Sequence, residues 1–327
     1  MATTLVSGAA FGAALVASGV HQPAAIISQL KLDNFHMLES FLTGAATSGI
    51  IVSTLQISKL TNLSPRRYTT IGLFADFDGN IAGGLLIGAG MALSGACPGT
   101  VLAQVGAGIP SGLPALSGAV VAGTMWSGFL KEWLQHQASP PCSKAEGRSK
   151  TVDKLLGIRP VAATAALETI FVTVVLGLLS LNQKPIGGLV SPVVGGLFIG
   201  AAQLVSIMLR KTTLGVSTAF EESGQCLLSL RGSRTPKAQN ILFAVGVTLG
   251  AWLLSTVSPQ ANPATAVVVP TTHSVLGGFV VVIGALIADG CTSGHGISGT
   301  SLLSVSSLIT TAAMLAGGII VAGLMPL

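Results

Sequence analysis

Long apolar stretches separated by short polar segments run along the whole chain. A helix needs about 20 predominantly apolar residues to cross a bilayer. Nine stretches approach this length, and we predict a transmembrane helix for each: residues 5–20, 38–57, 81–97, 110–130, 161–181, 189–209, 240–257, 273–290 and 299–324. The pattern therefore predicts an all-α, polytopic membrane protein.

Four segments between these stretches are too apolar or too rich in small residues to be ordinary loops. They comprise residues 18–32, 97–108, 210–230 and 291–299. Non-helical backbone at membrane depth is tolerated where it is buried in protein or lines a watery cavity. We therefore expect four central re-entrant loops or short helices.

Two of these segments follow the same sequence pattern. The glycine pair at 83–84 precedes Cys97 by twelve mostly apolar residues, and the pair at 277–278 precedes Cys291 by the same number. Interrupted helices at corresponding positions of two halves mark the binding site of many transporters. This pattern makes the two cysteines the first candidates for a functional site.

Composition agrees with a membrane protein and excludes a soluble one. The chain of 327 residues is 50% hydrophobic and 8% charged, whereas a soluble domain is usually about a quarter charged. The net charge of +5 is no nucleic-acid footprint, because the basic residues lie in short loops between spans. Neither an enzyme nor a cofactor is predicted.

The distribution of basic residues predicts the orientation. With the N-terminus in the cytoplasm, the cytoplasmic segments are 58–80, 131–160 and 210–239, and they hold 14 of the 16 basic residues. These are Lys59, Arg66, Arg67, Lys131, Lys144, Arg148, Lys150, Lys154, Arg159, Arg210, Lys211, Arg231, Arg234 and Lys237. The positive-inside rule therefore puts the N-terminus in the cytoplasm and the C-terminus outside. We expect the host membrane to be the plasma membrane.

Nine spans in this orientation make the two halves antiparallel. We predict a first membrane repeat at 1–134, a cytoplasmic linker at 135–160, a connecting helix at 161–188 and a second, inverted repeat at 189–327. The Cys97 segment then approaches from outside and the Cys291 segment from inside. Such repeats place a site near the bilayer midplane.

The residues after Cys97 favour anion binding. Pro98 suits the first turn of a new helix, Gly99 lets a ligand approach the backbone, and Thr100 adds a hydroxyl. Amide groups at a helix N-terminus attract anions. In the second segment, the corresponding candidates are Thr292, Ser293, Gly294, His295 and Gly296.

Each candidate also has a purely structural interpretation. A cysteine is often a small buried hydrophobe, although matched positions at two helix breaks favour function. His295 either contacts substrate or holds its own loop by hydrogen bonds. A metal site is disfavoured, because Cys291 and His295 supply only two ligands and Cys97 comes from the opposite face.

Two acidic residues lie in apolar segments. Intramembrane ionisable groups are functional candidates by default. Glu168 would carry a coupling proton or pair with a cation of the linker. Asp289 would accept amide hydrogen bonds from the Cys291 segment, as a helix cap does.

At these motifs the chain resembles the YeeE/YedE sulphur-transport family. The strong matches are LSGACPGT at 93–100 and ADGCTSGHGISG at 288–299, and weaker ones are FGAALVASGVHQPAAIISQLKL at 11–32 and LGVSTAF at 214–220. The whole chain is similar to two half-length family units joined together.

The resemblance implies a carrier or channel that moves thiosulfate, or a related sulphur species, inward. Cys97 and Cys291 match thiols that would pass the anion along through transient contacts. Thiosulfate-carrying relatives have a further cysteine in the motif that matches residues 11–32, where this chain has none. Cys226 lies near the motif at 214–220. Partners are therefore a sulphur anion and the lipid bilayer.

Two other functions fit the same residues. The chain would be a pore for another small anion, or a membrane thiol protein that relays persulfide sulphur covalently. Nothing marks a general base beside either cysteine, which favours permeation. The fourth cysteine, Cys142, lies in the polar linker and is expected to be incidental.

Overall fold

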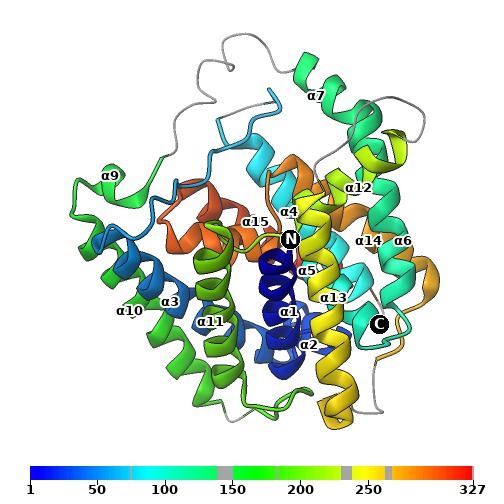
Figure 1. The fold of residues 1–327 in the computed structure, drawn as a ribbon, viewed down its shortest axis with the longest axis horizontal. Helices are drawn as coiled ribbons and strands as arrows, with labels where there is room; N and C mark the ends of the chain where they lie inside the picture. Colours follow the sequence, from blue (N-terminus) through cyan, green and yellow to red (C-terminus); the bar gives the residue numbers. More distant parts are fainter. Residues whose placement is uncertain (74–75, 138–149, 182, 230–237, 262–266, 326–327) are drawn as a thin grey trace.

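The protein is a bundle of helices. The computed structural model describes all residues except 74–75, 138–149, 182, 230–237, 262–266 and 326–327. Within the described part, the regular elements are all helical, which confirms the predicted all-α class (Figure 1). Cys142 lies outside the described residues.

Each predicted apolar stretch contains a helix. Among the described residues these are α1 (Ala2–Ala17), α3 (His36–Ile57), α4 (Asp78–Ser94), α6 (Gly112–Met125), α10 (Pro160–Leu179), α11 (Pro192–Arg210), α13 (Gln239–Val257), α14 (Thr271–Ile287) and α15 (Val305–Leu324). The fourth stretch extends past its predicted end at 130, because α6 continues through a π-helical turn, η1 (Trp126–Leu130), into α7 (Lys131–Gln137).

Most of these helices have the length and composition of membrane spans. Seven apolar helical stretches of 18 residues or more occur in the described chain, and one of them, Asp78–Gly106, includes a helix on each side of a break. Two further apolar helices, α1 and α14, are shorter, at 16 and 17 residues. At 1.5 Å per residue each is about 25 Å long, and both are followed directly by an interruption.

Short helices occupy the four segments between the spans. They are α2 (Pro23–Leu30), α5 (Pro98–Gly106), α12 (Ser217–Ser229) and the π-helical turn η3 (Ser293–Gly299). Both α2 and α5 begin with proline, which fits the first turn of a helix because that turn has no use for the missing amide hydrogen.

The described ends of the predicted linker are partly ordered against the bundle. A short helix, α9 (Val152–Leu156), lies next to α10. Just before it, Thr151 forms an isolated antiparallel bridge with Ser304. The Val152 amide donates to the Leu303 carbonyl at 2.9 Å. This end of the linker is thereby attached to the chain between η3 and α15.

Glycines set the distance between crossing helices. In Figure 1, α1 and α13 run side by side at the centre. A Cβ on Gly12 would overlap the Val247 carbonyl, and one on Gly250 would overlap Ala9. Small residues let helix backbones approach in this way within a membrane. The same arrangement occurs where Gly88 of α4 faces Met314 of α15.

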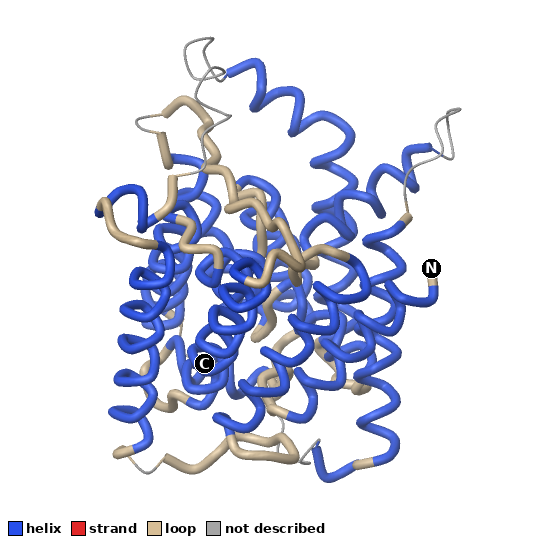
Figure 2. The backbone as a smooth tube through the Cα atoms, turned by 60° about the vertical axis from the view of Figure 1, so that its left-hand side comes forward, coloured by secondary structure: helices blue, strands red, loops and turns tan. Residues whose placement is uncertain are grey.

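The packing partners form matching pairs. Helix α1 packs on α13 and α3 on α11; α4 packs on α15 and α14 on α6; α5 packs on α13 and η3 on α3. In chain order, the first six elements are α1, α2, α3, α4, α5 and α6, and their counterparts in the second half are α11, α12, α13, α14, η3 and α15. When each element is replaced by its counterpart, the first contact of each pair above becomes the second. Figure 2 shows the long helices with loops at both ends of the bundle and also within it.

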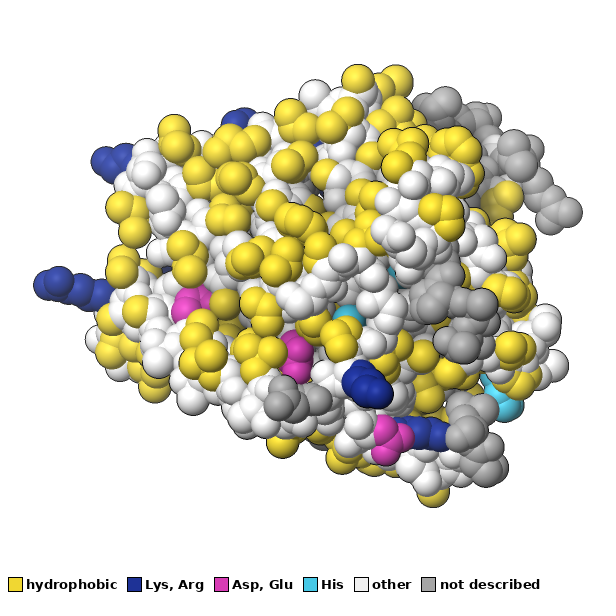
Figure 3. All heavy atoms as spheres, turned by 90° about the horizontal axis from the view of Figure 1, so that it is seen from below, with side chains coloured by type: hydrophobic (Ala, Val, Ile, Leu, Met, Phe, Trp, Pro, Cys, Tyr) yellow, Lys and Arg dark blue, Asp and Glu magenta, His cyan; other side chains and the backbone are white. Residues whose placement is uncertain are grey.

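The outer surface carries many apolar side chains. In Figure 3, hydrophobic atoms cover most of the visible face and charged groups are few and scattered. On α10, for example, Ile170 is 58% exposed and Leu176 is 62% exposed. Such a surface suits lipid rather than water.

Replacing Gly12 with alanine should destabilise the protein. The new methyl group meets the Val247 backbone carbonyl, which cannot rotate away, and overpacking of this kind costs about 1–3 kcal/mol. Gly177→Ala on α10 is the matched control, because a Cβ there meets nothing within 4 Å. Thermal unfolding in detergent measures both variants, and equal midpoints for the two would contradict this account of the crossing.

Candidate functional site

The first cysteine lies at a sharp helix break. Helix α4 ends where Gly95 takes a left-handed conformation, with φ at 61°, which glycine adopts without strain. Two residues later, Cys97 caps the N-terminus of α5 and Pro98 occupies its first turn. The predicted interruption is confirmed, and its cause is the glycine followed by the proline.

The Cys97 side chain is part of the cap. Its Sγ accepts a hydrogen bond from the Thr100 amide at 3.4 Å, and Thr100 Oγ1 accepts one from the Cys97 amide at 2.7 Å. This reciprocal capping box satisfies two amides that a helix start otherwise leaves without partners. The sulphur acts here as an acceptor, so its S–H remains available as a weak donor.

The second cysteine lies at another break. Helix α14 ends at Ile287, and Asp289 adopts a left-handed conformation with φ at 56°. Cys291 is fully buried. Its Sγ accepts a hydrogen bond from the Val216 amide at 3.4 Å and lies 3.2 Å from Ser293 Oγ. Val216 directly precedes α12, so the motif at 214–220 contacts the motif at 288–299.

The two breaks meet at one small internal cavity of about 30 Å³. Its polar lining comes from both: Cys97, Gly99, Thr100, Thr292 and Ser293. Apolar side chains complete the wall: Phe11, Leu15, Val20, Met37, Phe41, Ile199 and Ile297. This volume accommodates about two water-sized spheres, and the Cys291 thiol is not among the lining residues.

The His295 ring belongs to η3, which contributes Ser293 and Ile297 to the lining of the cavity. It is fully buried, with Nε2 2.9 Å from the Ala288 carbonyl and Nδ1 3.0 Å from Ser307 Oγ. A carbonyl only accepts, so Nε2 carries the proton and Nδ1 accepts from the serine hydroxyl. Both nitrogens are used, and the ring holds its segment in place.

Two glycines let large side chains approach η3. A Cβ on Gly296 would overlap the Phe41 ring, and one on Gly294 would lie 2.8 Å from Arg66 Nη2. Pro98 is buried in the first turn of α5. The predicted site residues therefore divide into those that line the cavity and those that shape its walls.

Three further candidates lie elsewhere. Cys226 is half-buried on α12, and Glu168 of α10 is buried against Gly49 of α3. In the described structure no cation pairs with Glu168, and its Oε2 has no hydrogen-bond partner. Asp289 uses its backbone carbonyl, which accepts from Arg66, and within the described chain its carboxylate does not accept the amide hydrogen bonds that we predicted for a cap.

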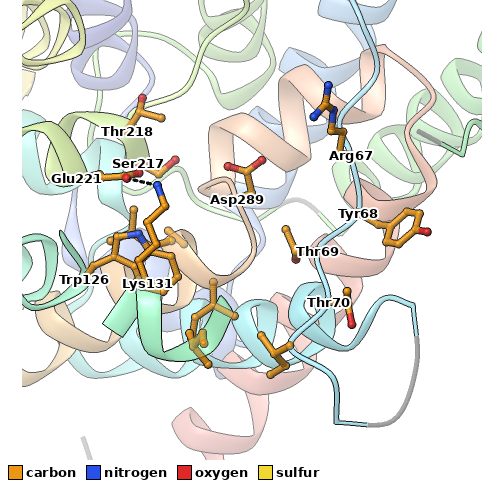
Figure 4. Close-up of a pocket in the computed structure, with 15 residues that line it drawn as sticks. Arg67, Tyr68, Thr69, Thr70, Trp126, Lys131, Ser217, Thr218, Glu221 and Asp289 are labelled. Atoms are coloured by element: carbon orange, nitrogen blue, oxygen red, sulfur yellow. Dashed lines mark hydrogen bonds and ion pairs between the residues drawn. The ribbon is translucent and has the colours of Figure 1, made fainter. Parts of the chain in front are cut away.

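A larger vestibule adjoins the Cys291 break. It has a volume of about 470 Å³, and its charged lining residues are Arg67, Lys131, Glu221 and Asp289. Lys131 Nζ lies 2.7 Å from Glu221 Oε1. Figure 4 shows this ion pair on one side of the space and the extended segment 67–70 on the other. The predicted orientation places the vestibule on the cytoplasmic side.

Sequence reasoning missed Arg66 as a site residue. Its Nε donates to the Gly294 carbonyl and its Nη1 to the Asp289 carbonyl, both at 2.7 Å. In the sequence it is one of many cytoplasmic basic residues, which the positive-inside rule already explains. Sequence reasoning also missed the apolar residues that line the cavity, such as Val20 in the motif at 11–32.

Comparison with known proteins agrees with this architecture. The sequence profile described as sulphur transport matches residues 17–320. The chain is 28% identical to the thiosulfate transporter TsuA of Spirochaeta thermophila over 250 residues, which covers 71% of this chain and 73% of that protein.

A shorter relative matches part of the chain. A probable transporter from Xylella fastidiosa (strain Temecula1) is 34% identical over 134 residues, which covers 41% of this chain and 93% of that protein. Together with the apolar helices, these matches identify an integral membrane transporter and not an enzyme. The match along almost its entire length shows that the chain belongs to the sulphur transport family.

Proposed function

We propose that this protein carries thiosulfate, or a closely related sulphur anion, into the cell through a constriction at the cavity that Cys97 lines, with the Cys291 thiol buried beside it against Ser293. The observation that carries the proposal is that two thiol-led helix breaks, 194 positions apart in sequence, meet at one cavity. The family match and the thiosulfate transporter among the relatives support the choice of substrate class.

The chemistry of the constriction suits passage rather than storage. Its polar lining consists of a thiol, hydroxyls and backbone without a charged side chain. Conduction requires binding that is favourable enough for entry and weak enough for release. The S–H group of Cys97 and the hydroxyls of Thr100, Thr292 and Ser293 donate weakly or singly, so each contact with a sulphur anion is brief.

A covalent persulfide relay has less support. It requires a base that removes the thiol proton. The neighbouring histidine, His295, is committed to Ala288 and Ser307 through both ring nitrogens. A pore for a different small anion would account for the hydroxyl groups but not for the two cysteines at matched helix breaks.

We also propose that the transporter consists of two inverted repeats, 1–134 and 189–327, with the linker 135–160 and the connecting segment 161–188 between them. The matching helix contacts support this division, as does the half-length relative from Xylella. Counting α1 and α14 as spans gives nine crossings. The protein would lie in the plasma membrane with its N-terminus in the cytoplasm.

Replacing Cys97 or Cys291 with alanine should reduce thiosulfate uptake by about tenfold, because a donor lost at a desolvated site costs 1–3 kcal/mol. Cys226→Ala is the matched control, since that thiol lies on α12 away from the cavity. Uptake of labelled thiosulfate by cells expressing each variant measures the effect. Serine should retain partial flux, whereas complete loss in both serine variants would favour the covalent relay.

Unlabelled sulfate should compete poorly with labelled thiosulfate. The two dianions have similar shape, but the terminal sulphur is softer and less strongly hydrated than oxygen. Sulfate gives up stronger water contacts at a constriction that offers no cation in return, and each unsatisfied polar group costs about 1–3 kcal/mol. Equal inhibition by sulfate and thiosulfate in a competition assay would refute this selectivity.

Reporter fusions in the segment 58–77 and after residue 327 should report opposite sides of the membrane. An odd number of spans follows from counting both short helices, and the basic segments fix the N-terminus inside. Alkaline phosphatase fused after residue 327 should be active, and the same fusion in the segment 58–77 inactive. Activity at both positions, or at neither, would overturn the nine-span arrangement.

A further inference from the structure

The segment 58–73, which follows α3, lies against the Cys291 break through Arg66 and Arg67. The Arg66 carbonyl accepts a hydrogen bond from Ser304 Oγ at 3.1 Å, and the Arg67 carbonyl accepts one from Ser306 Oγ at 3.2 Å. The backbone of this segment is thereby attached to the chain that follows η3. Its best-placed charged side chain toward the break is Arg66.

The Arg66 guanidinium spans the break. Nε donates to the Gly294 carbonyl and Nη1 to the Asp289 carbonyl, at 2.7 Å each. These two carbonyls flank Cys291, one on each side along the chain. One rigid group thus fixes the distance between the end of α14 and the start of η3, which the flexible chain of a lysine would not reproduce.

The remaining amino group faces the thiol region. Arg66 Nη2 lies 2.8 Å from the position of a Cβ on Gly294, and Cys291 Sγ lies 3.7 Å from that same position. A Cβ on Gly215 would likewise lie 3.4 Å from Nη2. Gly215 directly precedes Val216, whose amide donates to Cys291 Sγ. An anion at Cys291 is therefore a near neighbour of this cation.

We propose that Arg66 is the inner latch of the transport pathway and the cation that receives the anion from Cys291. This proposal rests on the proposed function for the identity of the anion. Guanidinium binds oxyanions through two parallel hydrogen bonds, and charge-assisted bonds of this kind are roughly twice as strong as neutral ones. An arriving dianion therefore displaces the carbonyls of Asp289 and Gly294, and the released segment opens toward the vestibule.

The same carbonyls explain release. Once the anion moves into the vestibule, the Arg66 fork returns to the Asp289 and Gly294 carbonyls and closes the break. A cation without such partners would hold a dianion in place. Competition between backbone and anion lets one full positive charge act here without trapping the solute.

The decisive measurement is the reactivity of Cys291 from the inner side. Inside-out vesicles containing the full-length protein are treated with a charged methanethiosulfonate reagent, and the modified Cys291 peptide is quantified by mass spectrometry. The wild-type thiol should react slowly and should react faster when thiosulfate is added. Without any anion, Cys291 in Arg66→Gln should react about tenfold faster, because losing one hydrogen bond from a charged donor changes an equilibrium constant by about that factor. Thiosulfate should have no further effect on this variant.

Lys59→Gln is the matched control, because it removes an exposed cation from the same segment without touching the break. It should behave like the wild type. An Arg66→Gln rate equal to the wild-type rate, or an equal acceleration by thiosulfate in both, overturns the latch. If Arg66→Gln does not elute as a folded protein in detergent, Arg66→Lys takes its place, and a wild-type rate in that variant overturns the proposal.

Uptake measurements separate this proposal from the proposed function. Arg66→Lys should raise KM for thiosulfate several-fold while the Lys59→Gln value stays at the wild-type level. If the wild type takes up no thiosulfate, the proposed function fails. Faster labelling of Cys291 in Arg66→Gln without any anion still supports the latch in that case, and unchanged labelling rejects it.

Discussion

The architecture depends on satisfying backbone polar groups where helices stop inside the bundle. An unpaired amide or carbonyl in an apolar interior costs several kcal/mol. At the first break, Cys97 and Thr100 satisfy each other's amides. At the second, Arg66 satisfies two carbonyls and His295 a third. The side chains proposed to meet the solute, or their immediate neighbours, therefore also stabilise the breaks.

Several helix crossings elsewhere in the bundle are closely packed. Where Gly12 meets Val247 and Gly88 meets Met314, backbones touch without intervening side chains. Densely packed elements shift between discrete arrangements rather than deforming continuously. The cavity between the breaks, by contrast, is bordered by side chains such as Phe41 and by loops that a few hydrogen bonds hold in place. Movement is thus expected at the breaks and the segment that covers them.

The sequence predicted what depends on local chemistry and missed what depends on contacts between distant residues. Gly95 followed by Pro98 marks a helix break by backbone geometry alone, and apolar stretches identify spans by length. The partners of His295 were not predictable, because Ser307 and Ala288 become its neighbours only when η3 folds between α14 and α15. Arg66 was hidden for a similar reason, since 228 positions separate it from Gly294 and an ordinary charge rule accounted for it.

Charged side chains occur along the proposed pathway on the cytoplasmic side of the constriction, and two of the cations there already have partners. Lys131 is paired with Glu221, and the Arg66 fork is bound to carbonyls. An anion therefore exchanges partners with these cations instead of filling an empty positive site. The free energy gained on arrival is a difference between two similar interactions, so binding stays shallow. In the proposed function, the uncharged constriction would then select the anion by how readily it loses water, and the paired cations near the Cys291 break would favour its departure into the cytoplasm.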